Sequence, residues 1–127
     1  MNDISELKSP PHAMEAEASV LGALLASNDS FDLLAGKLAE ADFYTHDNRL
    51  IYRAIAALLS AQKPADAISV AQWLKDRNEL DKVGGFAYLQ ELQSGHGLVT
   101  NLPVYAELVR EKAVVRAILT ASMAMGD

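Results

Sequence analysis

The chain has 127 residues, half of them hydrophobic, 22% charged and 6% aromatic, and this length allows one compact domain rather than two. Its 17 Asp and Glu residues outnumber its 11 Lys and Arg residues, and the net charge of −6 disfavours strong binding to nucleic-acid phosphates. The sequence contains no cysteine, which excludes a disulfide, a thiolate zinc site and a thiol nucleophile and is typical of a reducing compartment. We find neither a signal-peptide pattern nor a run of about eighteen apolar residues, so we expect a cytoplasmic protein without a membrane span.

The composition favours an all-α fold. Ala and Leu together far outnumber Val, Ile and Thr, and this balance is typical of helices rather than strands. We expect about six helices in three parts, namely a flexible arm over residues 1–11, a globular helical domain over 12–100 and a long helix over 101–127. The arm contains Pro10 and Pro11 but few apolar residues, so it cannot order itself by burying apolar surface.

Hydrophobic spacing places the first two helices. A helix over residues 13–26 follows the double proline, because apolar residues recur there at helical intervals. Its apolar positions are Ala16, Val20, Leu21, Leu24 and Leu25. The polar residues 27–30 form a break that can end this helix and cap the next. The second helix is short and is expected to bury Phe31, Leu34 and Leu38.

Three further helices are predicted in the middle of the chain. The third covers residues 48–62, with Asp47 as its expected cap and Pro64 as its stop. Ser69 is placed to cap a fourth helix that carries Val70, Trp73 and Leu74, and Gly84 and Gly85 open a fifth that carries Phe86, Leu89 and Leu92. Residues 94–100 contain two glycines and lack a sustained period, which predicts an exposed loop.

The last predicted helix runs from Leu102 to Met125, because Pro103 lies in its tolerated first turn and no later residue breaks a helix. One face is expected to dock on the domain core, and it carries Val104, Leu108, Val115 and Leu119, with Tyr105 at its edge. The opposite face starts with charged residues but becomes apolar partway along, and Arg116 is the only charge from residue 113 to 125. The apolar part of that face consists of Val114, Ala117, Ile118, Ala121 and Met125.

A helix that is apolar on every side should be buried, and this segment lacks an obvious cover. It is too short for a bilayer, and the preceding domain is too small to surround it. Exposing a few hundred Å² of apolar surface costs several kcal/mol at about 25 cal/mol per Å², so association with a partner is predicted. We therefore assign self-association or partner binding to the five apolar positions. The alternative is that the helix bends back and buries this face in its own core.

One combination of residues suggests an enzyme. His46 and Asp47 are adjacent and, with His12 and His96, could form a metal site like that of HD-type phosphohydrolases. Such ligands must lie on neighbouring packed helices, yet His12 lies in the entry segment and His96 in a Gly-rich stretch. The simpler interpretation is that Asp47 caps a helix and His46 is exposed, so we predict no catalytic, metal-binding or cofactor-binding residue.

Three other features were weighed for function. Glu15 and Glu17 point in different directions and are interpreted as first-turn charges that interact with the helix dipole. The sequence contains no G-x-x-x-x-G-K-[ST] phosphate loop. The aromatic residues are mostly expected in the core, but Tyr88 and Tyr52 have polar ends that could face a partner, and we include Tyr88 among the partner-binding candidates.

Four blocks of the sequence carry a family resemblance. They are PPHAMEAEASVLGALL (10–25), DFYTHDNRLIYRAI (42–55), VGGFAYLQEL (83–92) and VYAELVREKAVVRAIL (104–119). In this order and spacing they resemble the amino-terminal domain of bacterial replicative DNA helicases of the DnaB family. One departure is Asn48, where that family commonly has histidine after the aspartate.

The resemblance implies a globular helical domain followed by a helical hairpin, a linker and a RecA-like ATPase domain that uses ATP and magnesium. On this basis the sequence ends inside the first hairpin helix. Domains of that family pair through their hairpins into a collar on a hexameric ring, and the collar receives the helicase-binding domain of primase and, in some bacteria, a loader. Val114, Ile118, Ala121 and Met125 would then be pairing positions.

We therefore expect a non-catalytic assembly and docking domain of an ATP-dependent replicative helicase, acting in subunit pairing and primase binding. Its expected partners are other copies of itself, primase and a loader, without strong nucleic-acid binding and without a membrane. Two alternatives stay open at this point, a free-standing helical adaptor and an HD-type metal phosphohydrolase.

Overall fold

The computed structural model describes residues 10–34, 36–96 and 101–125, with the side chains of His96, Ala124 and Met125 excepted. Within these ranges the chain forms six α-helices and two 3-10 turns and contains no strand, so the all-α prediction is confirmed. The elements are α2 (Met14–Ala26), α3 (Ser30–Leu34), η1 (Glu40–Asp42), α4 (His46–Ser60), α5 (Ala67–Asp76), η2 (Asp81–Val83), α6 (Gly85–His96) and α7 (Leu102–Met125). No helix among the described residues is long and apolar enough to span a bilayer.

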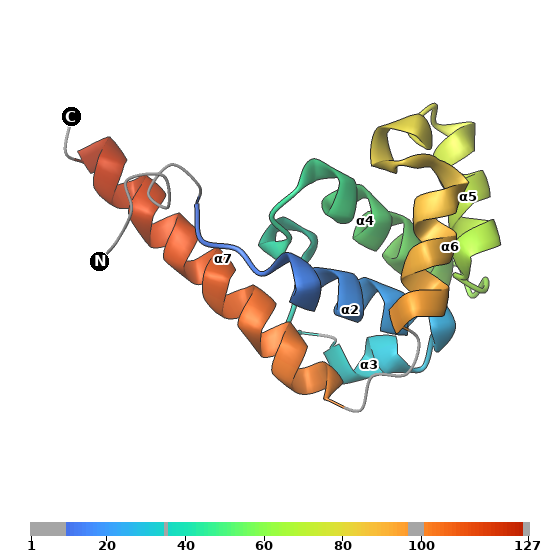
Figure 1. The fold of residues 1–127 in the computed structure, drawn as a ribbon, viewed down its shortest axis with the longest axis horizontal. Helices are drawn as coiled ribbons and strands as arrows, with labels where there is room; N and C mark the ends of the chain where they lie inside the picture. Colours follow the sequence, from blue (N-terminus) through green and yellow to red (C-terminus); the bar gives the residue numbers. More distant parts are fainter. Residues whose placement is uncertain (1–9, 35, 97–100, 126–127) are drawn as a thin grey trace.

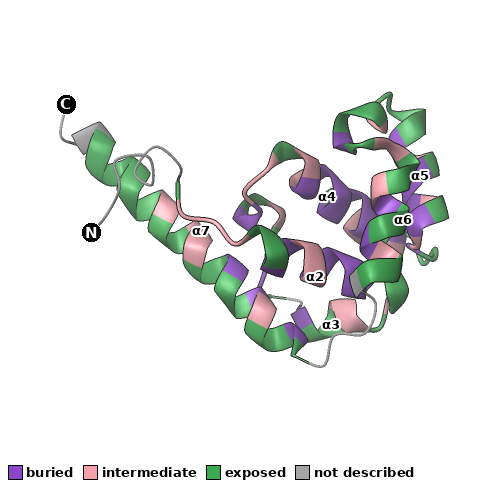
Figure 2. Cartoon of the chain, in the orientation of Figure 1, coloured by how far each residue is buried: buried purple, intermediate pink, exposed green. Residues whose placement is uncertain are grey.

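Helix α2 lies at the centre of the domain and contacts α4, α6 and α7 (Figure 1). Its apolar residues at helical spacing are buried, as predicted, and Val20, Leu21 and Leu24 are inaccessible to solvent. Helices α4, α5 and α6 complete the core on the side away from α7, where Leu50, Ile55 and other aliphatic side chains are buried (Figure 2).

Helix α7 packs against one side of the domain and then extends beyond it (Figures 1 and 2). Its predicted bounds are confirmed, but the predicted core-facing side is wrong. Leu102, Ala106 and Val109 are the buried residues, whereas the positions predicted to dock are exposed at 36% or more. These exposed positions are Val104, Leu108, Val115 and Leu119. The sequence does carry a signal for this side, because Leu102, Ala106 and Val109 recur at intervals of four and three on a side of the helix that has no charged residue within its first two turns.

Two predicted helix caps are also corrected. Thr45, not Asp47, is the N-cap of α4, and its side chain accepts a hydrogen bond from the Asn48 amide. Asp66 caps α5 by accepting from the backbone amide of Ser69, the residue predicted to be the cap. Helix α4 begins two residues earlier than predicted, and α5 begins three residues earlier. The cap residue lies just before the helix and its side chain accepts from an amide inside the first turn.

The remaining differences concern the ends of short helices. Helix α3 ends at Leu34, so Leu38 is buried from the connection that follows rather than from a helix. Helix α6 continues through His96 over the start of the predicted loop, and residues 97–100 of that loop lie outside the described residues. Gly84 takes a left-handed conformation with φ of 97°, which glycine adopts without strain, immediately before α6.

Candidate interface along helix α7

Arg116 joins α7 to two segments that are distant in sequence. Its Nη1 donates to the Pro11 carbonyl oxygen at 2.8 Å, and its Nη2 donates to the Asp42 carbonyl oxygen at 2.7 Å. Six residues earlier, Arg110 donates to the Asp42 carboxylate at 2.8 Å. The second carboxylate oxygen of Asp42 accepts from the Ala39 amide at 2.8 Å. Asp42 is buried, so these contacts set how α7 lies against η1.

Aromatic packing reinforces the same junction. The Arg116 guanidinium lies 5.3 Å from the centre of the Tyr44 ring, within the range of a cation–π contact. His12 stacks on Tyr44 with ring centres 4.3 Å apart. The residues that precede α2, the segment after η1 and helix α7 therefore meet around Tyr44.

A buried polar network lies beneath this junction. Glu17 on α2 accepts hydrogen bonds from the Tyr44 amide and from the Asn48 side chain, both at 2.9 Å. The Asn48 oxygen in turn accepts from the Tyr88 hydroxyl at 3.2 Å. Glu17 and Asn48 are each only 1% exposed, so the network ties α2, α4 and α6 together through satisfied polar groups.

This position of Glu17 corrects the interpretation that it only meets the helix dipole from the first turn. Burial of the Tyr88 side chain, together with the nearby acidic residues Asp47, Glu17 and Glu91, raises the pKa of its hydroxyl. The Tyr88 hydroxyl is bonded inside the domain, so only the partly exposed ring could meet the predicted partner.

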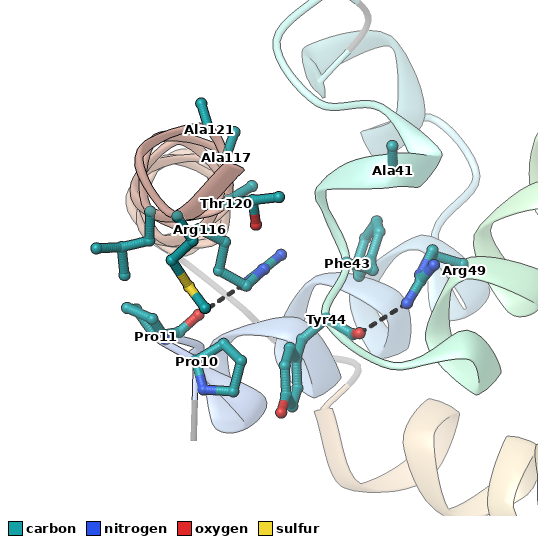
Figure 3. A pocket seen from close by; sticks show the side chains of 13 residues that line it. Pro10, Pro11, Ala41, Phe43, Tyr44, Arg49, Arg116, Ala117, Thr120 and Ala121 are labelled. Atoms are coloured by element: carbon teal, nitrogen blue, oxygen red, sulfur yellow. Dashed lines mark hydrogen bonds between the residues drawn. The ribbon is translucent and has the colours of Figure 1, made fainter. Parts of the chain in front are cut away.

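Two open cavities flank the C-terminal half of α7. The arm-side groove has a volume of about 890 Å³ and lies between α7, Pro10 and Pro11, and the segment after η1 (Figure 3). Arg116 and Thr120 point from α7 toward that segment (Figure 3). The second groove, of about 430 Å³, adjoins the first around α7 and lies against Ala41 and Asp42. Ala117 and Ala121 line both grooves.

Four of the five predicted partner-binding positions on α7 line the second groove. Val114 is 41% and Ile118 is 59% exposed, and both line this groove with Ala117 and Ala121. Met125 ends the helix, but its side chain lies outside the described residues. The described part of this face is therefore not buried in the domain's own core, which was the alternative.

The described residues of the suggested metal site do not form one. Among the residues that the structure describes, no group of three His, Asp or Glu side chains could hold a metal ion. His46 is exposed at the start of α4, and His12 packs on Tyr44. The His96 side chain lies outside this description.

The sequence interpretation missed the roles of Glu17 and Asp42. A signal for Glu17 was present, because it falls in line with Val20, Leu21 and Leu24 at intervals of three, four and seven residues. An acid in an apolar stripe is typical of a buried, bonded carboxylate. No comparable signal marks Asp42, since its partners Arg110 and Arg116 are far away in sequence.

Comparison with known proteins gives a consistent family. A family model for the DnaB-like helicase N-terminal domain matches residues 9–111. The replicative DNA helicase DnaB of Haemophilus influenzae is 40% identical over 116 residues, covering 91% of this chain and 25% of that protein. The corresponding helicase of Buchnera aphidicola subsp. Baizongia pistaciae is 36% identical over 118 residues, covering 93% of this chain and 26% of that protein.

Solved structures agree with this result. The crystal structure of the N-terminal domain of DnaB helicase from Mycobacterium tuberculosis matches with a TM-score of 0.87 and 37% identity, covering 91% of this chain and 81% of that one. The DnaB N-terminal domain from Helicobacter pylori, described together with its interactions with primase, matches with a TM-score of 0.76 over 98% of this chain and 95% of that one. Its identity of 17% shows the fold alone.

The fold is thus that of a helicase N-terminal domain, a helical domain with a long final helix. The chain belongs to the DnaB-like helicase N-terminal domain family. It spans about a quarter of the length of the two helicases with which it was compared.

Proposed function

We propose that this domain is a non-catalytic assembly and docking unit of an ATP-dependent replicative DNA helicase. In this role it pairs with other copies of itself through α7 and presents a surface to primase. ATP and magnesium would bind elsewhere in the complete helicase, because the sequence has no phosphate loop and the described residues have no cluster suited to a metal. We also propose that other parts of the complete helicase carry out ATP hydrolysis and DNA unwinding, because the family model that matches this chain describes the N-terminal domain only.

The observation that carries the proposal is the exposed apolar side of the C-terminal half of α7. Val114 and Ile118 are exposed next to Ala117 and Ala121, and no acidic or basic side chain separates them along this side of the helix. Burying such a surface against a partner contributes roughly 25 cal/mol per Å². Small residues between larger ones also let a second helix approach closely, so a second copy of α7 and the segment that follows it would fit here.

The experiment compares this chain with a version extended by the fifty residues that follow it in its gene. Light scattering is expected to find that the 127-residue chain is monomeric or associates weakly, and that the extended version forms dimers or hexamers. Ile118→Asp should return the extended version to a smaller mass, because an unpaired charge is costly to bury. Equal masses for the two unmodified versions would contradict the pairing role.

Ile68→Asp is the matched control for this variant. Ile68 lies on α5, away from α7, and is 70% exposed against 59% for Ile118, so both changes place an acid on an exposed isoleucine position. The control should leave the mass unchanged. Loss of association by both variants would show a general effect of charge rather than an interface at Ile118.

Primase docking is supported by the relatives, since the H. pylori domain of this fold is described with its interactions with primase. A pull-down of the extended version with the C-terminal domain of the primase from the same organism tests this role. Retention by the unmodified version and by Ile68→Asp is expected. Failure of both to retain primase would leave self-association as the remaining proposed role.

A loader, where the organism has one, is a further expected partner of the complete helicase.

A further inference from the structure

A continuous series of polar contacts crosses the domain from α6 to the segment on which α7 rests. Tyr88 on α6 donates from its hydroxyl to the Asn48 oxygen at 3.2 Å, and the Asn48 nitrogen donates to one carboxylate oxygen of Glu17 at 2.9 Å. The other oxygen of this carboxylate accepts from the Tyr44 amide at 2.9 Å. We call the series from Tyr88 to Tyr44 the polar path. Helices α6 and α7 contact different sides of α2, so the path connects them across the domain (Figure 1).

Each link of the polar path restricts the next. The side-chain amide of Asn48 has its nitrogen at Glu17 and its oxygen at Tyr88, so both ends fix its orientation. Without the Tyr88 hydroxyl, the Asn48 amide is held at one end only and its buried oxygen loses a donor. Glu17 and Asn48 are each 1% exposed, so bulk solvent cannot readily replace a lost hydrogen bond. A change at Tyr88 is therefore expected to reach the Tyr44 amide.

Tyr44 lies beside the contacts that hold the C-terminal half of α7. The carbonyl oxygen of Asp42, two residues earlier in the chain, accepts from Arg116 at 2.7 Å. The guanidinium of Arg116 also lies 5.3 Å from the centre of the Tyr44 ring. The Tyr44 carbonyl accepts from Arg49 at 2.9 Å, which ties the same segment to α4 (Figure 3). The position of the Tyr44 main chain therefore affects both acceptors that Arg116 meets here.

Helix α7 is attached less firmly toward its end. Its last buried residue is Val109, and residues 110–123 are half-buried or exposed. A helix end with so little buried surface opens locally at a small cost in free energy. The C-terminal half of α7 therefore has two states, one with Arg116 bonded to the Asp42 carbonyl and one with that bond released.

We propose that the polar path couples α6 to the attachment of α7. With Tyr88 bonded to Asn48, the Asp42 carbonyl stays in place for Arg116, and the C-terminal half of α7 rests against the domain. When the Tyr88 hydroxyl leaves Asn48, that half of α7 is released more often. A partner that turned the half-buried Tyr88 ring would in this way change how firmly the surface on α7 is held. The coupling is a property of this chain alone and does not depend on the proposed pairing.

Amide hydrogen exchange of the 127-residue chain tests the proposal. Tyr88→Phe removes the hydroxyl at the α6 end of the polar path and should speed the exchange of α7 amides after residue 113 several-fold. Tyr52→Phe is the matched control, because the Tyr52 hydroxyl donates at the same distance of 3.2 Å to the Leu38 carbonyl, outside the path. The control should leave these α7 amides unchanged. Amides of α4 report any general loss of stability in both variants.

Combining Tyr88→Phe with Arg116→Met distinguishes coupling from two separate effects. Arg116→Met alone should speed exchange in the same part of α7, and adding Tyr88→Phe should then have no further effect there, because the contact through which it acts is already lost. Circular dichroism checks that every variant keeps its helical content. Unchanged α7 exchange in Tyr88→Phe, or an equal effect of Tyr52→Phe, would overturn the proposal. So would a full further effect of Tyr88→Phe in the Arg116→Met variant.

Discussion

Arg116 donates a hydrogen bond of 2.7 Å to the main-chain carbonyl oxygen of Asp42, and the same guanidinium binds the carbonyl of Pro11 at 2.8 Å. The only charged residue in the apolar stretch 113–125 is thus used to hold that stretch against the domain. The direction in which α7 leaves the domain, and therefore the surface it offers to partners, depends on this contact.

Arg116→Met should loosen the C-terminal half of α7. The change keeps most of the side-chain length but removes two charge-assisted hydrogen bonds, which should lower the free energy of unfolding by about 1–3 kcal/mol. Urea unfolding measures this loss. Compared with the unmodified chain, amide hydrogen exchange of the variant should speed up more in α7 after residue 113 than in α4. Arg53→Met is the matched control, because Arg53 binds Glu40 in an exposed ion pair that should contribute less than about 1 kcal/mol. Equal losses for the two variants would contradict the assigned role of Arg116.

Glu17→Leu should be strongly destabilising. The substitution leaves the Tyr44 amide and the Asn48 side chain without their buried acceptor, at about 1–3 kcal/mol for each unsatisfied group. Glu17→Gln should cost much less. If the Asn48 amide flips, its oxygen accepts from Gln and its nitrogen donates to the Tyr88 hydroxyl, so the hydrogen bonds are retained in the reverse direction.

The combination of Glu17→Gln with Tyr88→Phe tests this reversal. Phe removes one hydrogen bond from Asn48 in either orientation of its amide, so the losses of the two single variants should add in the double variant if the network reverses. Urea unfolding of all four proteins in the cycle measures the coupling. A double variant that loses clearly less than the sum would show that Tyr88 prevents Asn48 from flipping in the Glu17→Gln variant.

Stability should fall as the pH rises above about 10, the ordinary tyrosine pKa. Burial raises the pKa of both Tyr52 and Tyr88 in the folded protein, so the folded state retains protons that the unfolded state releases. Their contribution is therefore complete below the unfolded pKa and is lost as the pH rises toward the folded values. Unfolding free energies at several alkaline pH values measure the slope. Tyr88→Phe should make the slope shallower, and an unchanged slope would show that Tyr88 does not contribute.

Acidic pH should weaken one surface contact slightly. The hydrogen bonds from Arg53 lower the pKa of Glu40 below its ordinary value of 4.5, so the folded state favours the ionised carboxylate. This contribution is present above the unfolded pKa and is lost as the pH falls through the folded pKa. Because the pair is exposed, Glu40→Gln should cost less than about 1 kcal/mol at neutral pH and progressively less as the pH falls through the lowered folded pKa. A loss that persists at the lower pH would indicate a different role for Glu40.

The sequence alone determined the helical class, the bounds of α7 and most of the core. These features depend on local patterns, such as the spacing of Val20, Leu21 and Leu24 or the unbroken helical stretch from Leu102 to Met125. The exposed apolar positions Val114 and Ile118 were also identified in this way, because a helix with so few charges has apolar residues on more than one side.

Only the tertiary structure decided how the C-terminal half of α7 lies against the domain and how Glu17 is used. After residue 112 the helix is apolar on almost every side and periodicity indicates no preferred side, so polar contacts with distant residues hold it: Arg116 reaches the carbonyl oxygens of Asp42 and Pro11. Glu17 likewise depends on an amide and a side chain that lie 27 and 31 residues away. Hydrogen bonds between such distant residues leave no local pattern in a sequence, because folding alone brings the partners within bonding distance.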